Sequence, residues 1–283
     1  MDIELTLPCG VLVKDGSGEG YTVERDVTIR GMTAGVKKEL GKKTIRTEPS
    51  KAQDIVLQSC VVSIGGKTEI TKNMIQGMLA GDRDYLLFQI RKHSLGGALN
   101  GRIACINPSC GEVQGLSMDI DNDFKVYSLP DTMEIFTPEN QAPYRTFSID
   151  DDEYNLHFVF RHETGHDRRA VASLLQANQV EAKMVLMGRT LISGTLDGIE
   201  LVGPVGPSVF DKMDLAAYDR LSVQYDANCP GIDLTVEANC VACGTLNSWE
   251  IDASDFFGQS GVSKKLQNKS TLRSGQSASL LQD

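Results

Sequence analysis

Two pairs of cysteines constrain this sequence more than any other feature. Cys105 and Cys110 form a C-x4-C spacing, Cys240 and Cys243 form a C-x2-C spacing, and a glycine follows each pair. The segments on both sides of each pair roughly alternate apolar and polar residues, which is typical of half-buried strands. Each pair is therefore predicted to lie in the tight turn of a zinc-knuckle β-hairpin, where the glycine permits the positive φ that turns backbone N–H groups toward sulfur.

The cysteines are predicted to bind a metal rather than to form disulfides. The chain has seven of them, an odd number, and its acidic N-terminus lacks the pattern of a secretory signal. A structural zinc ion takes four tetrahedral ligands. One Zn²⁺ joining both hairpins would be bound by Cys105, Cys110, Cys240 and Cys243, with no position left for water. Buried free thiols are the alternative, and Cys229 is the first candidate to replace one of the four ligands.

The two halves of the chain contain similar segments in the same order, offset by about 130 to 135 residues. The matched segments are 3–8 with 133–138, 27–38 with 158–169, 55–65 with 184–194, 78–83 with 215–220, and the two cysteine pairs. A conserved order of five matches indicates an internal duplication.

This duplication predicts an α+β fold of two pseudo-repeats that meet at the shared four-cysteine zinc site. Each repeat would consist of strands, helices and a zinc-knuckle hairpin. The predicted repeats are residues 1–125, with the knuckle at 105–110, and residues 126–258, with the knuckle at 240–243. A flexible, basic tail is predicted for residues 259–283, which are rich in Ser, Gln and Lys. Helices are expected at 49–64, 71–93, 167–175, 180–193 and 208–225.

A second motif resembles a catalytic metal site. His162, Glu163 and His166 match H-E-x-x-H, which in zinc proteases presents two imidazoles and a general base from one helix. Here a strand-like alternation runs directly into the motif, Thr164 resembles a helix N-cap, and Gly165 disfavours a helix interior. We therefore expect a strand-to-helix turn with two surface histidines. A zinc metallohydrolase remains an alternative function.

Composition narrows the classes of partner. The net charge of −10 argues against binding to phosphate backbones, and no apolar stretch approaches the ~20 residues of a membrane span. No convincing nucleophile–base set is present. We expect a protein that is not an enzyme and has no nucleic-acid, membrane or small-molecule partner. A zinc-ribbon module that recruits another protein is a further alternative.

Several short motifs together resemble the baseplate hub assembly chaperones of T-even-like contractile phage tails and related contractile injection systems. The resemblance covers about residues 3–257. It rests on Leu5–Gly10 followed by Asp15-Gly16, Arg30 with Thr33, Gly81–Leu87 with Ile90-Arg91, Cys105 and Cys110-Gly111 followed by Met118–Ile120, the Arg161-x-x-Thr164-Gly165-x-Asp167 pattern, and Cys240 and Cys243-Gly244 with Phe256-Phe257.

The resemblance implies a non-enzymatic assembly factor or minor structural component of a contractile tail baseplate hub. Such a protein would bind hub or other tail proteins. It would act in the cytoplasm of the host or producing cell during assembly, and the virion tail baseplate is its second expected location.

Overall fold

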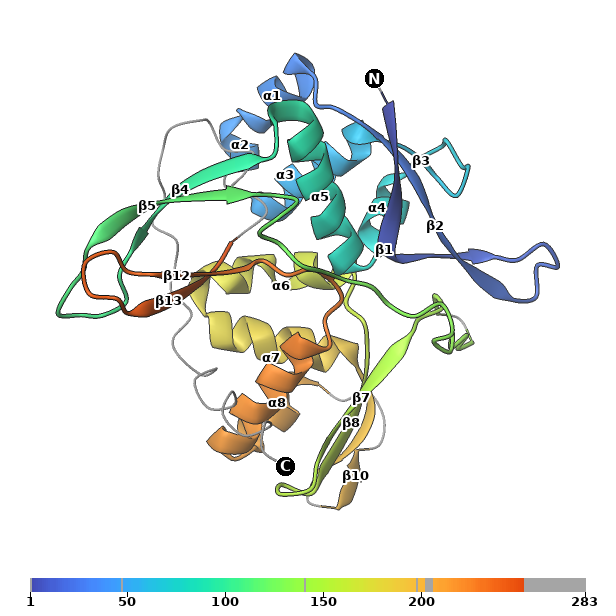
Figure 1. The fold of residues 1–283 in the computed structure, drawn as a ribbon. Helices are drawn as coiled ribbons and strands as arrows, with labels where there is room; N and C mark the ends of the chain where they lie inside the picture. The colour runs from blue at the N-terminus through green and yellow to red at the C-terminus, as the bar shows by residue number, and fades with distance from the viewer. Residues whose placement is uncertain (1, 47, 140, 197, 202–205, 252–283) are drawn as a thin grey trace, which may run out of the picture. The chain divides into compact units, whose positions relative to one another are not determined.

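The computed structural model describes residues 2–46, 48–139, 141–196, 198–201 and 206–251 (Figure 1). The predicted tail at 259–283 and Phe256-Phe257 lie outside the described residues. The chain divides into two compact units, each built from separate stretches of sequence. The first unit contains residues 1–96 and 126–232, and the second contains residues 97–125 and 233–283. The fold mixes helices with several small sheets, as predicted.

The first unit contains an antiparallel sheet in the order β1-β2-β3. In β2, Val27 and Ile29 alternate with more exposed residues and face the core, where Val56, Leu57 and Ile64 are also buried. The elements of this part are β1 (Asp2–Lys14), β2 (Tyr21–Arg30), α1 (Ala34–Leu40), α2 (Lys43–Arg46), α3 (Pro49–Cys60), β3 (Val61–Ile64), α4 (Lys72–Gly77) and α5 (Ala80–Leu95).

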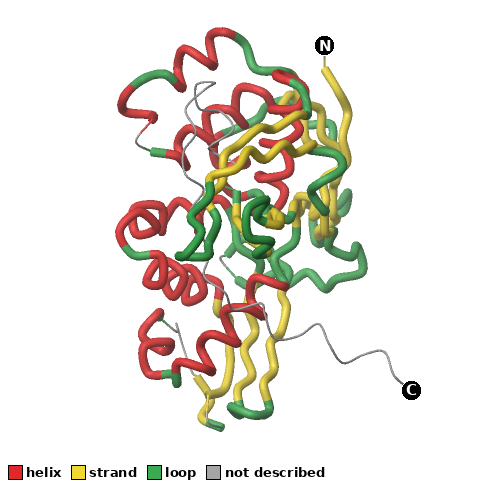
Figure 2. The backbone as a smooth tube through the Cα atoms, turned by 60° about the vertical axis from the view of Figure 1, so that its left-hand side comes forward, coloured by secondary structure: helices red, strands yellow, loops and turns green. Residues whose placement is uncertain are grey.

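The same unit contains a four-stranded antiparallel sheet in the order β10-β9-β8-β7. Figure 2 shows its strands side by side with helices along one side. Phe158 and Phe160 of β8 are buried in the core. The rings of Phe160 and Tyr225 pack edge to face, with their centroids 5.1 Å apart. The elements are β6 (Val126–Tyr127), β7 (Thr146–Asp151), β8 (Leu156–Arg161), α6 (Gly165–Ala177), α7 (Gln179–Thr190), β9 (Leu191–Leu196), β10 (Ile199–Leu201), η1 (Pro207–Lys212), α8 (Leu215–Ala227) and β11 (Gly231–Ile232).

Several predicted helices end earlier than the sequence suggested. The helix expected at 49–64 stops at Cys60, and the β-branched pair Val61-Val62 begins β3. The helix expected at 71–93 is broken at Met78-Leu79. The break is held by distant backbone partners, because Gly165 N–H donates to the Met78 carbonyl at 3.1 Å. Likewise, the helix expected at 180–193 ends at Thr190, where strand β9 begins. The helix expected at 208–225 is divided into η1 and α8.

Parts of the two proposed repeats have the same local architecture. In both, a β-hairpin leads to a helix, and a later helix runs directly into a third strand that pairs with the hairpin's second strand. Thr33 and Thr164 occupy the N-caps that follow β2 and β8. The match of 3–8 with 133–138 is wrong at the level of structure, because β7 at 146–151 takes the place of β1. The repeat boundaries stay a prediction, and the compact units divide the chain differently.

Gly81 allows two backbones to approach each other closely within the first unit. A Cβ at Gly81 would lie 2.1 Å from the Pro230 carbonyl oxygen, and Gly231 beside it has a φ of +110°. The start of α5 can therefore contact β11 only through glycine.

We predict that Gly81→Ala lowers the free energy of unfolding by about 2 to 3 kcal/mol, because rigid backbone must move to admit the methyl group. Gly77→Ala is the matched control, since a Cβ there meets nothing within 4 Å. Urea unfolding of both variants provides the measurement. Equal stability of the two variants would show that the close approach is not real.

Candidate functional site

The described part of the second unit consists mainly of two antiparallel hairpins, and each cysteine pair lies in the turn of one of them. The first hairpin pairs β4 (Ala98–Ala104) with β5 (Val113–Asp119), and the second pairs β12 (Thr235–Asn239) with β13 (Leu246–Glu250). Alternate residues of the strands are buried, as the sequence pattern predicted. The buried side chains include Leu99, Ile103, Met118, Val236 and Trp249.

The two turns are closed in similar ways. The N–H of the first cysteine donates to a carbonyl beyond the second cysteine, from Cys105 to Glu112 at 2.7 Å and from Cys240 to Thr245 at 2.9 Å. The glycines after the pairs have positive φ, +61° and +73°. The backbone conformation that the Cys-Gly sequences predicted is therefore present in both turns.

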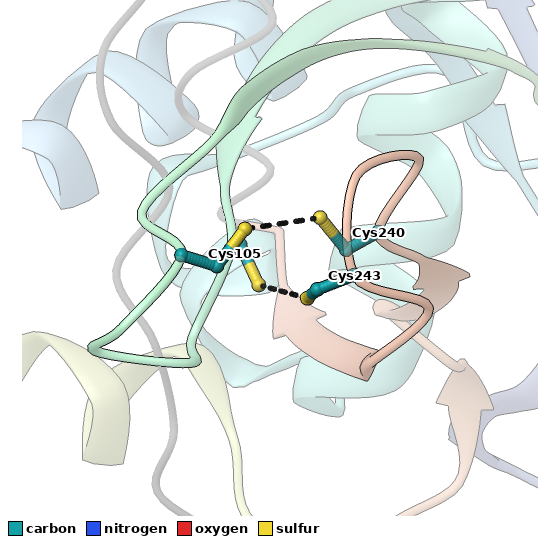
Figure 3. Close-up of side chains that lie close together, drawn as sticks. Cys105, Cys240 and Cys243 are labelled. Carbon is teal, nitrogen blue, oxygen red and sulfur yellow. Dashed lines mark hydrogen bonds between the residues drawn. The ribbon is translucent and has the colours of Figure 1, made fainter.

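These turns bring the four predicted cysteines together (Figure 3). The Sγ atoms of Cys105 and Cys243 are 3.5 Å apart, those of Cys110 and Cys240 are 3.8 Å apart, and all four lie within 4.8 Å of one another. A tetrahedron of sulfurs at about 2.3 Å from a central zinc has edges of about 3.8 Å. None of the four is in a disulfide. The arrangement is compatible with a four-sulfur metal site.

Two buried or half-buried amides join the hairpins beside the cysteines. The Asn247 side chain, only 1% exposed, accepts from Ile106 N–H at 2.7 Å. The Gln114 side chain donates to the Asn239 carbonyl at 3.0 Å and accepts from Val241 N–H at 2.8 Å. Sequence reasoning missed both residues, because no local pattern distinguishes an amide that bridges two distant hairpins.

The surroundings of the thiols differ, which separates their acidities. The Thr245 hydroxyl, 3.2 Å from Cys243 Sγ, lowers the pKa of that thiol to about 6. Burial and the neighbouring thiols raise the pKa of Cys105 to about 12. A bound cation would reverse the second effect, because a coordinated thiol loses its proton. The cluster can therefore supply thiolates to a metal, with release of protons on binding.

Cys229 does not take part in this cluster. It belongs to the first unit, where its thiol lies 3.5 Å from the carbonyl oxygen of Tyr225. Burial raises its pKa to about 12, which favours the protonated thiol.

The H-E-x-x-H motif forms the predicted strand-to-helix turn. His162 and Glu163 precede α6, which begins at Gly165, so the two histidines do not project from one helix. Thr164 and Asp167 form a capping box at the helix start. The expectation of two surface histidines is wrong for His162, which is 4% exposed. Among the described residues, only the four cysteines form a group that could hold a metal.

Glu163 is held in an ion network instead. Arg168 donates to Glu163 Oε1 from two nitrogens, at 2.7 and 2.9 Å, and also pairs with Asp84 of α5. The Glu163 carbonyl accepts from Ala80 N–H at 2.9 Å. These contacts connect the start of α5 to the start of α6, and they assign Glu163 a structural position.

A second ion cluster lies beside the first. Asp54 of α3, 4% exposed, accepts from Arg83 at 2.8 Å and from Arg169 at 2.6 Å. Gly165 makes room for the Arg83 side chain, because a Cβ at position 165 would lie 2.7 Å from Arg83 Nε. Asp82, which precedes Arg83 in the sequence, accepts from Cys9 N–H at 2.7 Å.

The buried His162 ring is neutral. Neither ring nitrogen has a hydrogen-bond partner among the described residues, and Phe147 lies 4.9 Å away between ring centroids. Burial, with the nearby positive charge of Arg145, lowers the His162 pKa to about 4. As the pH falls, His162 is therefore protonated in the unfolded chain before it is protonated in the folded chain, since an unfolded histidine has a pKa of about 6.5. The contribution to stability is complete above about pH 6.5 and is lost progressively toward pH 4.

When the pH is lowered from about 7.5 to about 5, the free energy of unfolding should fall in both proteins. We predict that it falls by about 1 to 2 kcal/mol less in His162→Leu than in the wild type. His166→Leu, which removes the exposed imidazole of the same motif, should retain the wild-type pH dependence. Urea titrations at both pH values measure this. An unchanged pH dependence in His162→Leu would contradict a buried, neutral imidazole.

A metal-binding prediction separates the two candidate sites. Co²⁺ added to reduced protein should give the visible absorption of tetrahedral thiolate coordination at about one ion per chain. Cys240→Ser should lose most of this signal, because one sulfur is removed, whereas His162→Leu should keep it. Retention by Cys240→Ser together with loss in His162→Leu would move the site to the histidine motif.

Comparison with known proteins gives one match. A family model described as T4 bacteriophage base plate protein matches residues 19–186, more than half of the chain. The search of curated proteins and the search of solved structures found no match. Among the described residues, no helix is both long and apolar enough to cross a membrane.

Proposed function

Because the chain belongs to the T4 bacteriophage base plate protein family, we propose that it is a non-enzymatic assembly factor or minor structural component of a contractile tail baseplate hub. The family match over residues 19–186 is the observation that carries this proposal. Membership in the family supports a structural component of the tail. The hub, and a role as an assembly chaperone, are the finer parts of the proposal, and they come from the resemblance of the motifs.

The proposed metal is a structural zinc ion bound by Cys105, Cys110, Cys240 and Cys243. The separations between the sulfurs support this choice, and soft thiolate ligands in a tetrahedral set are typical of zinc. Four protein ligands leave no coordination position for a reacting water. The site would therefore stabilise the second unit and would not perform chemistry.

We further propose that the chain arose by duplication, with each repeat contributing one knuckle. The shared hairpin, helix and third-strand arrangement of β1-β2-β3 and β7-β8-β9 supports this origin. The two cysteine pairs then occupy equivalent positions near the ends of the repeats.

The proposed partners are other proteins of the tail, met during assembly in the cytoplasm of the producing cell. A protein that works through contacts needs surfaces rather than a reactive cleft. The position of Glu163 within an ion network supports a structural role for the H-E-x-x-H motif over hydrolysis.

The test is affinity purification of the tagged chain from cells that produce tail proteins. We predict that identified baseplate proteins co-purify with the wild type and with His162→Leu, and that Cys240→Ser recovers several-fold less of them. The reason is that loss of the metal removes the folded second unit.

Two results would contradict the proposal. The first is absence of all baseplate proteins from the wild-type sample. The second is a peptidase activity of the purified chain that Glu163→Gln abolishes, which would favour a metallohydrolase.

A further inference from the structure

The cysteine end of the second unit carries an exposed apolar patch. Among the described residues of this unit, the exposed large apolar side chains are Val113, Val241 and Leu246, at 45%, 80% and 56% exposure. All three lie beside the contact between Gln114 and Asn239. Val113 precedes Gln114, Val241 N–H binds the Gln114 side chain, and Leu246 is paired with Asn239. The unit therefore exposes three large apolar side chains at its cysteine end, and apolar exposure of this kind is typical of a contact surface.

The unit that carries this patch is acidic. Its described cationic side chains are Arg102 and Lys125, whereas its described carboxylates are Glu112, Asp119, Asp121, Asp123, Asp233 and Glu237. Glu112 directly precedes Val113, so negative charge adjoins the patch. An occupant of this surface should combine apolar side chains with positive charge. A second copy would bring another acidic surface, which disfavours self-association.

The chain itself contains a segment of this chemistry. Residues 259–282 include Lys264, Lys265, Lys269 and Arg273 and no acidic residue, and Val262, Leu266 and Leu272 lie among the cations. This segment continues from Ile251, which directly follows β13 of the same unit. The 11 residues from Ile251 to Val262 can span up to about 36 Å. The five residues of β13 cover about 17 Å, so the segment can return to Leu246.

We propose that residues 262–273 dock on the patch formed by Val113, Val241 and Leu246. The leucines and valine would contact the patch, and the lysines and arginine would be attracted by the net negative charge of the unit, of which Glu112 lies at the patch. Covalent attachment makes this contact intramolecular, with an effective concentration in the millimolar range. The inference rests on the proposed metal centre only in that the two hairpins must be held together to form the patch.

Photo-crosslinking of the full-length, reduced chain in the presence of added zinc tests this proposal. With p-benzoylphenylalanine in place of Val113, mass spectrometry should find crosslinks to residues 259–273 within one chain. The same probe in place of Val223, a part-exposed position on α8 of the first unit, is the matched control and should give none.

Two variants should weaken the crosslink from position 113. Reversing the four charges, with Lys264→Glu, Lys265→Glu, Lys269→Glu and Arg273→Glu, should lower the yield about tenfold, because attraction to the acidic unit is replaced by repulsion. Val241→Ser with Leu246→Ser should also lower it, since the apolar contact is removed. Both changes lie at exposed or terminal positions, and circular dichroism verifies that the fold is kept.

Crosslinks formed only between chains would overturn the proposal in favour of a second copy as the occupant. Absence of any crosslink to residues 259–273, or a yield unchanged by both variants, would also overturn it. Zinc analysis of the same samples tests the metal centre separately. Intramolecular crosslinks in a sample that binds no zinc would contradict the metal centre and support the docking.

Discussion

The second unit brings together four sulfur atoms that come from opposite ends of a long stretch of sequence. Its hairpins are separated by residues 126–232, all of which belong to the other unit. Among its described residues the core is small, with Trp249 and a few aliphatic side chains buried between the strands. Small cores of this kind rarely suffice alone, and a bound metal would supply the missing free energy. The side chains of Asn247 and Gln114 set the register of the hairpins, but only a metal would make their approach strongly favourable.

The first unit is joined by charge and close backbone contact. Arg168 bridges Glu163 and Asp84, and Asp54 receives Arg83 and Arg169, so α3, α5 and α6 meet around buried carboxylates. Pairs of this kind contribute little net stability but make other arrangements costly, because each would leave an unpaired buried charge. We infer that they specify how the two halves of this unit fit together, a task that the proposed metal would perform in the second unit.

Local features were predictable from sequence, and features that depend on distant contacts were not. The Cys-Gly turns, the strands beside them and the cap at Thr164 follow from nearest neighbours in the chain. The break at Met78-Leu79 depends on residues 163–165, about 85 positions away. The burial of His162 follows from the packing of β7. The position of β7 could be predicted from the sequence only through the match of 3–8 with 133–138, which proved wrong. The clustering of the four cysteines was predictable because a C-x2-C or C-x4-C spacing is visible in the sequence, whereas packing leaves no such spacing.

X-ray absorption at the zinc edge of the purified, reduced, full-length chain tests the central claim most directly. The account predicts about one zinc per chain, surrounded by four sulfurs at about 2.3 Å. A first shell containing nitrogen or oxygen, or a folded and reduced chain with no zinc, would contradict it.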